Sequence, residues 1–350
     1  MNAASLTAPR PPAWRSTIVA LALGAMIGQA HAQPTAEPPS ATIFAYTRFG
    51  DDELPSSSVR VDQFEAHLRE LTSGGYAVLP LTEIASALRA GRPLPDRAVG
   101  IAIDDTHISV YREAWPRLQA AGLPFTLFVA TDTVDRARST HMSWDQVREL
   151  ASNGVEIGNL TASFAHLMDQ EPAFVVGQIE RANERIEAAL GRKPRLFAYP
   201  YGEYGNRLRE MVEASGFLAA FGLHSGVAHP GGDRFALPRF TINEQLGSIE
   251  RFRLAAQALP LPVTEITPRD MRIDANPPAF GFTTDAVVGD LEGLACFAVG
   301  YGRAQLERIG ERRVEVRLEE PFPPGRARIN CTMPAAEGRW RWFGAQFYVP

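Results

Sequence analysis

One apolar run in the middle of the chain most narrows the folds open to it. Residues 99–103, Val-Gly-Ile-Ala-Ile, carry no polar side chain and end at the adjacent carboxylates Asp104 and Asp105. A strand without polar alternation is buried on both faces, which is typical of a parallel sheet covered by helices. Other apolar runs of strand length alternate with helical patterns on both sides of it, so we expect repeated strand–helix units.

The units are expected to form a parallel α/β sheet or barrel over residues 41–260, after a flexible leader at 33–40. The spacing of apolar residues predicts strands at 41–46, 76–79, 99–103, 125–130, 155–157, 196–199 and 218–221, and helices at 61–71, 81–89, 109–121, 143–153, 172–190 and 205–215.

The sequence changes character after Pro260. Prolines mark a linker over 261–290, and a smaller all-β sheet or sandwich is expected over 291–350. Its aromatic side chains, Trp340 and Tyr348 among them, are assigned to its core rather than to a sugar-stacking surface. Short strands separated by Gly/Pro turns are expected at 295–299, 313–318, 326–331 and 340–348.

Residues 1–32 have the pattern of a secretory signal. Arg10 and Arg15 precede the apolar run 17–28, and Ala32 closes a small-x-small cleavage site. The run is shorter than the roughly 20 residues that a spanning helix needs, which leaves an uncleaved anchor as the alternative to cleavage. We expect a periplasmic or secreted protein without a membrane span after cleavage.

The composition and net charge exclude three classes of protein. A hydrophobic share of 45% fits neither disorder nor a multi-span membrane protein. The net charge is −5, and because cleavage removes two of the 35 basic residues and none of the 40 acidic ones, the mature chain has 33 against 40, or −7. This mild acidity lacks the electrostatic footprint of a nucleic-acid binder and leaves uncharged or cationic ligands open.

Cys296 and Cys331 are the cysteines of the chain. In an oxidising compartment we expect them to pair, which stabilises the fold by roughly 3–4 kcal/mol on the chain-entropy view. Two separately buried thiols are the alternative. Because no Cys/His spacing of a zinc site accompanies them, a zinc knuckle is disfavoured.

The Asp104–Asp105 pair is the most informative local feature. Ligands gather where parallel strands end, and neighbouring residues at a strand end point in different directions. One carboxylate can therefore hold a metal while the other handles a proton. A pair that only caps the next helix is the alternative.

Two further segments follow this pair along the chain. They are 156–164 (Glu-Ile-Gly-Asn-Leu-Thr-Ala-Ser-Phe) and 197–202 (Phe-Ala-Tyr-Pro-Tyr-Gly), and shorter phrases stand at 143–145, 222–226 and 237–240. In order and spacing, the pair and these segments resemble the polysaccharide deacetylase family, the NodB-like carbohydrate esterases, over about residues 41–245. The resemblance implies a distorted (β/α) barrel with fewer than eight strands and a site at the carboxyl ends of the strands.

The resemblance implies roles for single residues. Family members remove acetyl groups from glycans with a zinc-like divalent metal held by one Asp and two His. Asp104 would be the general base and Asp105 the first metal ligand. Tyr201 would offer a backbone N–H to the developing oxyanion, in a turn from Pro200 to Gly202 that shapes the acetyl pocket. The implied partner is an acetylated amino-sugar polysaccharide of a cell wall or exopolysaccharide.

The chain departs from the family at both histidine positions. The family motif reads His-Thr/Ser-x-x-His, and here Leu160 and Phe164 stand at those places. One aspartate cannot replace the three protein ligands of a catalytic zinc site, so we expect the metal site to be absent or weak. A relocated ligand such as His107 or His166 is an alternative. Leu160 and Phe164 would otherwise pack together and fill the vacated space.

Two further positions remain candidates. Ala198 stands where many members have an arginine that orients the base, and Arg239 is the candidate to supply that guanidinium. His224 is the candidate general acid, since residues 237–245 carry no clear Leu-x-His motif. Two functions stay open: by lineage a hydrolase of carbon–nitrogen bonds other than peptide bonds, and a non-catalytic glycan-binding or scaffold protein that keeps the groove.

Overall fold

The computed structural model describes residues 37–350, with Met1 and Ala8. The expected signal segment 1–32 and most of the leader 33–40 therefore lie outside the described residues. Ala36–Pro350 form one unit. Within 37–350, no helix has the length and apolar character to cross a membrane.

A nine-stranded, mostly parallel sheet confirms the predicted barrel. Its order is β10-β1-β5-β6-β7-β8-β9, with β11 beside β1 and β4 beside β5. Every residue of β5 is buried, as expected for a strand covered on both faces. The strands are β1 (Ala41–Tyr46), β4 (Ala77–Val78), β5 (Ala98–Asp104), β6 (Thr126–Val129), β7 (Glu156–Asn159), β8 (Leu196–Ala198), β9 (Ala219–Phe221), β10 (Val227–Ala228) and β11 (Phe240–Thr241).

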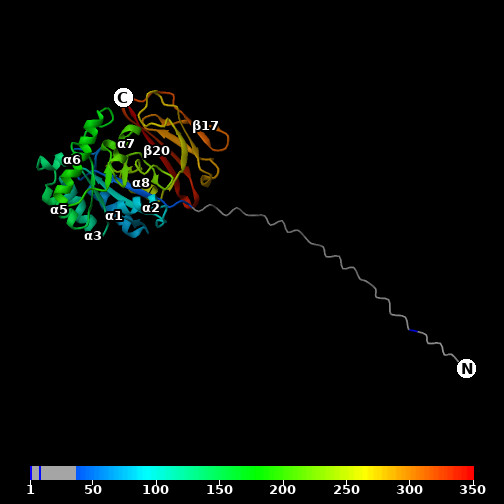
Figure 1. The fold of residues 1–350 in the computed structure, drawn as a ribbon, viewed down its shortest axis with the longest axis horizontal. Helices are drawn as coiled ribbons and strands as arrows, with labels where there is room; N and C mark the ends of the chain where they lie inside the picture. The colour runs from blue at the N-terminus through cyan, green and yellow to red at the C-terminus, as the bar shows by residue number, and fades with distance from the viewer. Residues whose placement is uncertain (2–7, 9–36) are drawn as a thin grey trace. The chain divides into compact units, whose positions relative to one another are not determined.

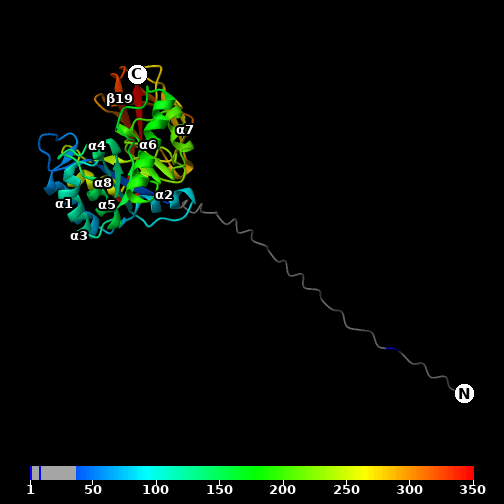
Figure 2. The ribbon, with the colours of Figure 1, turned by 60° about the vertical axis from the view of Figure 1, so that its left-hand side comes forward.

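Helices cover this sheet (Figure 1), and Figure 2 shows them from a second side. The predicted helix 109–121 is divided into a π-turn at Val110–Ala114 and α3, because Pro116 has no N–H to continue one ladder. Sequence patterns did not indicate α4 or α8. The helices are α1 (Val61–Ser73), α2 (Leu81–Arg89), α3 (Trp115–Ala120), α4 (Thr131–Asp135), α5 (Trp144–Ser152), α6 (Pro172–Leu190), α7 (Asn206–Ala214) and α8 (Ile249–Ala256).

Two antiparallel sheets follow the barrel and form the C-terminal module, defined here by β13 to β20. One has the order β12-β20-β19-β15-β16, where β12 comes from the end of the barrel, and the other β13-β14-β18-β17. Their strands are β12 (Leu259–Pro260), β13 (Val263–Thr267), β14 (Phe280–Thr284), β15 (Ala295–Ala298), β16 (Gly302–Arg303), β17 (Gln305–Ile309), β18 (Arg313–Arg317), β19 (Gly325–Pro334) and β20 (Trp340–Val349).

The range 261–290, expected to be a linker, contains strands β13 and β14. The prolines in this range lie outside both strands, and the alternate residues Phe280 and Phe282 of β14 are fully buried in the core of the module. The prolines of this range therefore flank the strands and do not mark a linker without strands. The placing of a domain boundary near residue 260 stays a prediction.

The module is held to the barrel and closed on itself by specific contacts. The Trp342 ring lies edge-on to Phe240, with 5.1 Å between the centroids. Leu261 N–H donates to the Trp342 carbonyl at 3.3 Å. Inside the module, Cys296 and Cys331 face each other across β15 and β19 and are joined by a disulfide.

Candidate functional site

The Asp104–Asp105 pair ends β5 and lies almost fully buried. Their side chains come from a point where the chain leaves the sheet, since Asp105 has a left-handed φ of 73°. Asp105 N–H donates to the Phe128 carbonyl at 3.0 Å, and the Asp105 carboxylate accepts from Thr106 N–H at 2.7 Å. The turn therefore directs the two carboxylates differently, as the sequence predicted.

Arg239 holds Asp104 through both carboxylate oxygens. The Nη1–Oδ1 and Nη2–Oδ2 distances are 2.6 and 2.9 Å, and Arg239 is 0% exposed. Its Nε donates to the Gly222 carbonyl at 2.8 Å, and its guanidinium lies over the rings of Phe128 and Phe221. This geometry fixes the orientation of the Asp104 carboxylate, and the role of Arg239 in orienting a general base stays a prediction.

Segment 156–164 forms a hydrogen-bonded turn, but apolar side chains stand at the two positions where the family motif has histidine ligands. Asn159 Oδ1 accepts from Thr161 N–H at 2.6 Å, and Thr161 Oγ1 accepts from Phe164 N–H at 3.1 Å. Leu160 is 0% exposed within an apolar cluster that includes Ala198, and Phe164 packs against that cluster. Leu160 thus lies in apolar surroundings, and Phe164 lies between that cluster and the open groove.

The third motif places an aromatic ring in the site. Pro200–Gly202 form a short 3-10 turn in which Tyr201 has a φ of 58°. Gly202 has a φ of 69°, and a Cβ there would lie 2.4 Å from Leu223, so only glycine fits. The Tyr201 ring stacks on His166 at 3.9 Å between centroids and lies 4.6 Å from the ring of Phe164.

The histidines near the site do not form a metal centre. His166 Nδ1 lies 2.8 Å from buried Glu203 rather than beside Asp105. His107 Nε2 lies 4.0 Å from Asp51, and burial lowers the pKa of His107. Among residues 37–350, no group of three or more His, Cys, Asp or Glu side chains is placed to hold a metal ion. The residues present therefore do not fit the family's metal.

One histidine near Asp105 was missed from the sequence. His141 Nε2 lies 3.5 Å from Asp105 Oδ2. It arrives there because His107 and His141 form an isolated antiparallel bridge between two loops. A pairing of two loops leaves no periodic pattern, so no sequence signal indicated it.

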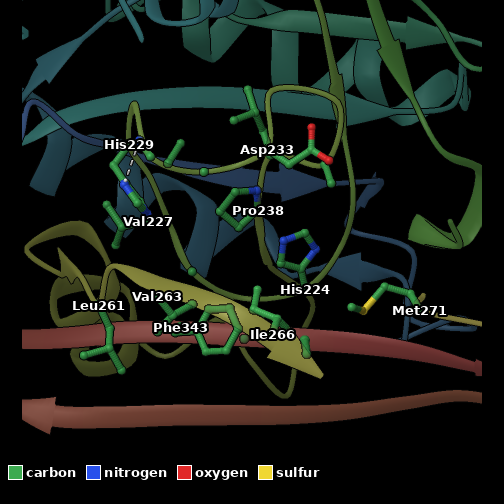
Figure 3. Close-up of a pocket in the computed structure, with 18 of the residues that line it drawn as sticks. His224, Val227, His229, Asp233, Pro238, Leu261, Val263, Ile266, Met271 and Phe343 are labelled. Carbon is green, nitrogen blue, oxygen red and sulfur yellow. Dashed lines mark hydrogen bonds between the residues drawn. The ribbon is translucent and has the colours of Figure 1, made fainter. Parts of the chain in front are cut away.

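His224, the candidate general acid, lines a different cavity. That cavity, of about 220 Å³, lies between the barrel and the module, with Pro238, Met271 and Phe343 in its wall (Figure 3). His224 is 8% exposed, and burial lowers its pKa to about 4. The structure thus does not bring the His224 side chain into the cavity that holds Asp104.

A second and larger cavity, which we call the groove, contains the Asp104–Asp105 pair. Its volume is about 890 Å³. Barrel residues line one part of it and residues 299–301 and 322–328 of the module line the rest. The lining residues are Thr47, Arg48, Ser56, Ser57, Asp104, Asp105, Phe164, Tyr201, Leu223, Thr241, Ile242, Asn243, Leu246, Val299, Gly300, Tyr301, Phe322, Pro323, Arg326, Ala327 and Arg328.

Comparison with known proteins agrees with this arrangement. The family profile described as polysaccharide deacetylase matches residues 91–220, a range that contains Asp104, Asp105 and Tyr201. Residues 91–220 are therefore similar to the polysaccharide deacetylase family. A poly-beta-1,6-N-acetyl-D-glucosamine N-deacetylase from Staphylococcus aureus is 23% identical over 213 residues, which are 57% of this chain and 73% of that protein.

Solved structures share the barrel fold of this chain. The Streptococcus pyogenes deacetylase PplD, in complex with acetate, is 20% identical with a TM-score of 0.59 and covers 63% of this chain and 99% of its own. IcaB from Ammonifex degensii is 26% identical with a TM-score of 0.55 and covers 63% of this chain and 99% of its own. More than a third of this chain thus lies outside the shared fold.

Proposed function

We propose that this polysaccharide-deacetylase-like protein is exported, binds an acetylated amino-sugar glycan in the groove, and has lost most or all of the family's metal-dependent hydrolysis. The observation that carries the proposal is the environment of Leu160. This side chain is 0% exposed in an apolar cluster at the place where the family motif has a histidine ligand.

The glycan-binding part of the proposal is supported by what the groove retains. Asp104 is held as a carboxylate by buried Arg239 and can accept hydrogen bonds from sugar hydroxyl or amide groups. The rings of Tyr201 and Phe164 offer apolar faces in the same cavity. A cavity of about 890 Å³ is within the size range of ligand sites in proteins. The S. aureus relative is named for a poly-N-acetylglucosamine substrate.

The loss of hydrolysis is supported by ligand chemistry. A catalytic zinc ion needs three protein ligands and one open position, and neither Leu160 nor Phe164 has a donor atom. Asp105 alone would leave a divalent ion weakly bound, and a weakly bound ion cannot keep a water molecule deprotonated at neutral pH.

A second candidate is hydrolysis with a relocated metal ligand. The observation in its favour is His141, whose Nε2 lies 3.5 Å from Asp105 Oδ2. Asp105 and His141 would then be two ligands of the ion. The metal content of the protein separates this candidate from the first.

The deciding experiment combines metal analysis, turnover and binding on the mature protein. We expect no stoichiometric zinc and no acetate release from acetylated chitooligosaccharides or acetylated xylan, together with chitooligosaccharide binding that Tyr201→Ala weakens. Stoichiometric zinc with turnover that Asp105→Ala abolishes would overturn the proposal in favour of the second candidate. Leu160→His with Phe164→His should create zinc binding, which tests whether the two positions are those of the family ligands.

A further inference from the structure

Three arginines line the groove beside the two aspartates. Arg48, Arg326 and Arg328 all line it. Asp104 is already paired with Arg239, which lies behind it and is fully buried. Asp51 and Glu203 lie 3.2 and 3.8 Å from Arg48 and Arg326, which leaves Arg328 as the groove arginine with no acidic partner among the described residues.

Arg328 is the least compensated of these cations. Its Nε donates to Gln346 Oε1 at 2.9 Å, and the ion pairs among residues 37–350 do not include it. Residues 2–36 contain no acidic side chain. Burial, together with neighbouring Arg326, lowers the pKa of Arg328 to about 10, so the side chain stays charged at neutral pH. A half-buried cation without an acidic partner is costly unless a ligand supplies the counter-charge.

Arg326 lies on the same face of β19. Because side chains alternate along a strand, Arg326 and Arg328 point away from the module core while Ala327 points into it. Arg326 Nε lies 3.8 Å from Glu203 Oε1, and its guanidinium is 5.7 Å from the centre of the Tyr201 ring. Like charges at alternate positions repel each other, and an anion between them relieves that repulsion.

The barrel side of the groove adds unused hydrogen-bond groups. Arg48, in the short strand β2 (Arg48–Phe49), donates from Nη1 to Asp51 at 3.2 Å. Its Nε is buried with no hydrogen-bond partner among the described residues, and the same holds for Thr241 Oγ1. Unpartnered polar atoms that line a cavity gain free energy when a ligand provides the missing hydrogen bonds.

We propose that the groove binds a glycan that carries anionic groups, and that Arg328 and Arg326 hold one such group while Tyr201 and Tyr301 contact sugar rings. The planar guanidinium suits the oxygens of a carboxylate or a sulfate, both of which occur as substituents of sugars. Tyr301 lines the groove and is 46% exposed. This inference rests on the proposed function, because it names the substrate class of the same groove.

Titration calorimetry on the mature protein tests the inference with acetylated oligosaccharides of equal length that are neutral, carboxylated or sulfated. We expect at least one anionic set to bind about tenfold more tightly than the neutral set at low salt, which corresponds to about 1.4 kcal/mol. The advantage should shrink as the salt concentration rises, because exposed charges are screened. The anionic set that binds more tightly identifies the group that the arginines hold.

Variants assign the effect to single residues. Arg328→Gln should remove most of the advantage of the anionic oligosaccharide, and Arg328→Lys should keep part of it. Arg303→Gln is the matched control, since Arg303 is an exposed arginine of β16 outside the groove, and it should keep the full advantage. Thermal unfolding of each variant shows that it is folded under the binding conditions.

Two results would overturn the inference, and they differ in what else they overturn. Equal affinity for neutral and anionic oligosaccharides would contradict the anionic substrate class and leave the glycan groove standing. Failure of every oligosaccharide to bind the folded protein would contradict the groove as a glycan site and with it the proposed function.

Discussion

Asp104 and Arg239 form a buried ion pair in the site. The Asp104 side chain is 8% exposed and the Arg239 side chain 0%, so each depends on the other for its counter-charge. A buried pair of this kind adds little net stability by itself, but breaking it is expensive because one charge is left alone. The pair therefore keeps the Asp104 carboxylate in one orientation.

Arg239→Met should lower the free energy of unfolding by about 3 kcal/mol or more, because it leaves the Asp104 charge buried without a partner. Urea unfolding at pH 7 measures the loss. Adding Asp104→Asn to this variant should recover part of the stability. Arg181→Met, which breaks the exposed pair with Asp132 at 3.3 Å, is the control and should change stability far less. Equal losses in the two single variants would contradict the argument.

Buried His67 predicts a dependence of stability on pH. Its Nε2–H donates to the Gly247 carbonyl at 2.9 Å, its Nδ1 lies 3.1 Å from the Tyr46 hydroxyl, and its ring stacks on Phe252. Burial lowers the pKa of His67 to about 4. In the unfolded chain histidine titrates near 6.5, so between about pH 6.5 and pH 4 only the unfolded state binds the proton. Stability should therefore fall as the pH falls through this window.

His67→Gln should be less stable than the parent protein at pH 7.5 and should also have a flatter pH dependence. The slope between pH 6.5 and pH 4.5 should decrease by up to about 1.4 kcal/mol per pH unit, the value for one proton. Urea unfolding at several pH values measures it. An unchanged slope would show that His67 is not held neutral in the folded protein.

At the scale of the elements, the sequence best predicted the strands and helices that have a local pattern of apolar residues. The run 99–103 and the Asp pair predicted β5 and the position of its carboxylates, because full burial and an abrupt polar end are local properties. His141 was out of reach, since it meets Asp105 only through a bridge between two loops. The alternation of side chains along β19 indicates that Arg326 and Arg328 share one face of the strand. It does not indicate that this face lines the groove, because that depends on how the module lies against the barrel.

The same strand carries the disulfide, which joins β19 to β15 at a Cα–Cα distance of 4.0 Å. Replacing both Cys296 and Cys331 by alanine should lower the free energy of unfolding by about 3–4 kcal/mol, because the unfolded chain regains the freedom of the closed loop. Denaturant unfolding with and without reductant measures the effect. Reductant should destabilise the parent protein and leave the double variant unchanged, and a response of the double variant would point to another cause.

At the scale of the whole molecule, the groove is formed where the barrel and the C-terminal module meet. The barrel alone supplies Asp104, Asp105 and Tyr201, whereas Arg326 and Arg328 come from the module. The net charge of the chain does not predict these arginines in the groove, because it sums the charges of the whole surface and the groove wall is a small part of that surface. Binding of the proposed anionic glycan should therefore depend on how firmly the module is docked.

Trp342 is the side chain through which docking can be tested. Its ring lies edge-on to Phe240 of the barrel, and its carbonyl accepts from Leu261 N–H. Trp342→Ala should lower the free energy of unfolding by about 3 kcal/mol and separate the unfolding of module and barrel into two transitions. Trp340→Ala is the control. Trp340 lies on the same strand but is 37% exposed, so its predicted place in the core was wrong, and its variant should keep one transition. If Trp342→Ala weakens binding of anionic oligosaccharides while the barrel stays folded, the module wall contributes to the site. Unaltered affinity in that variant would place the ligand on the barrel alone.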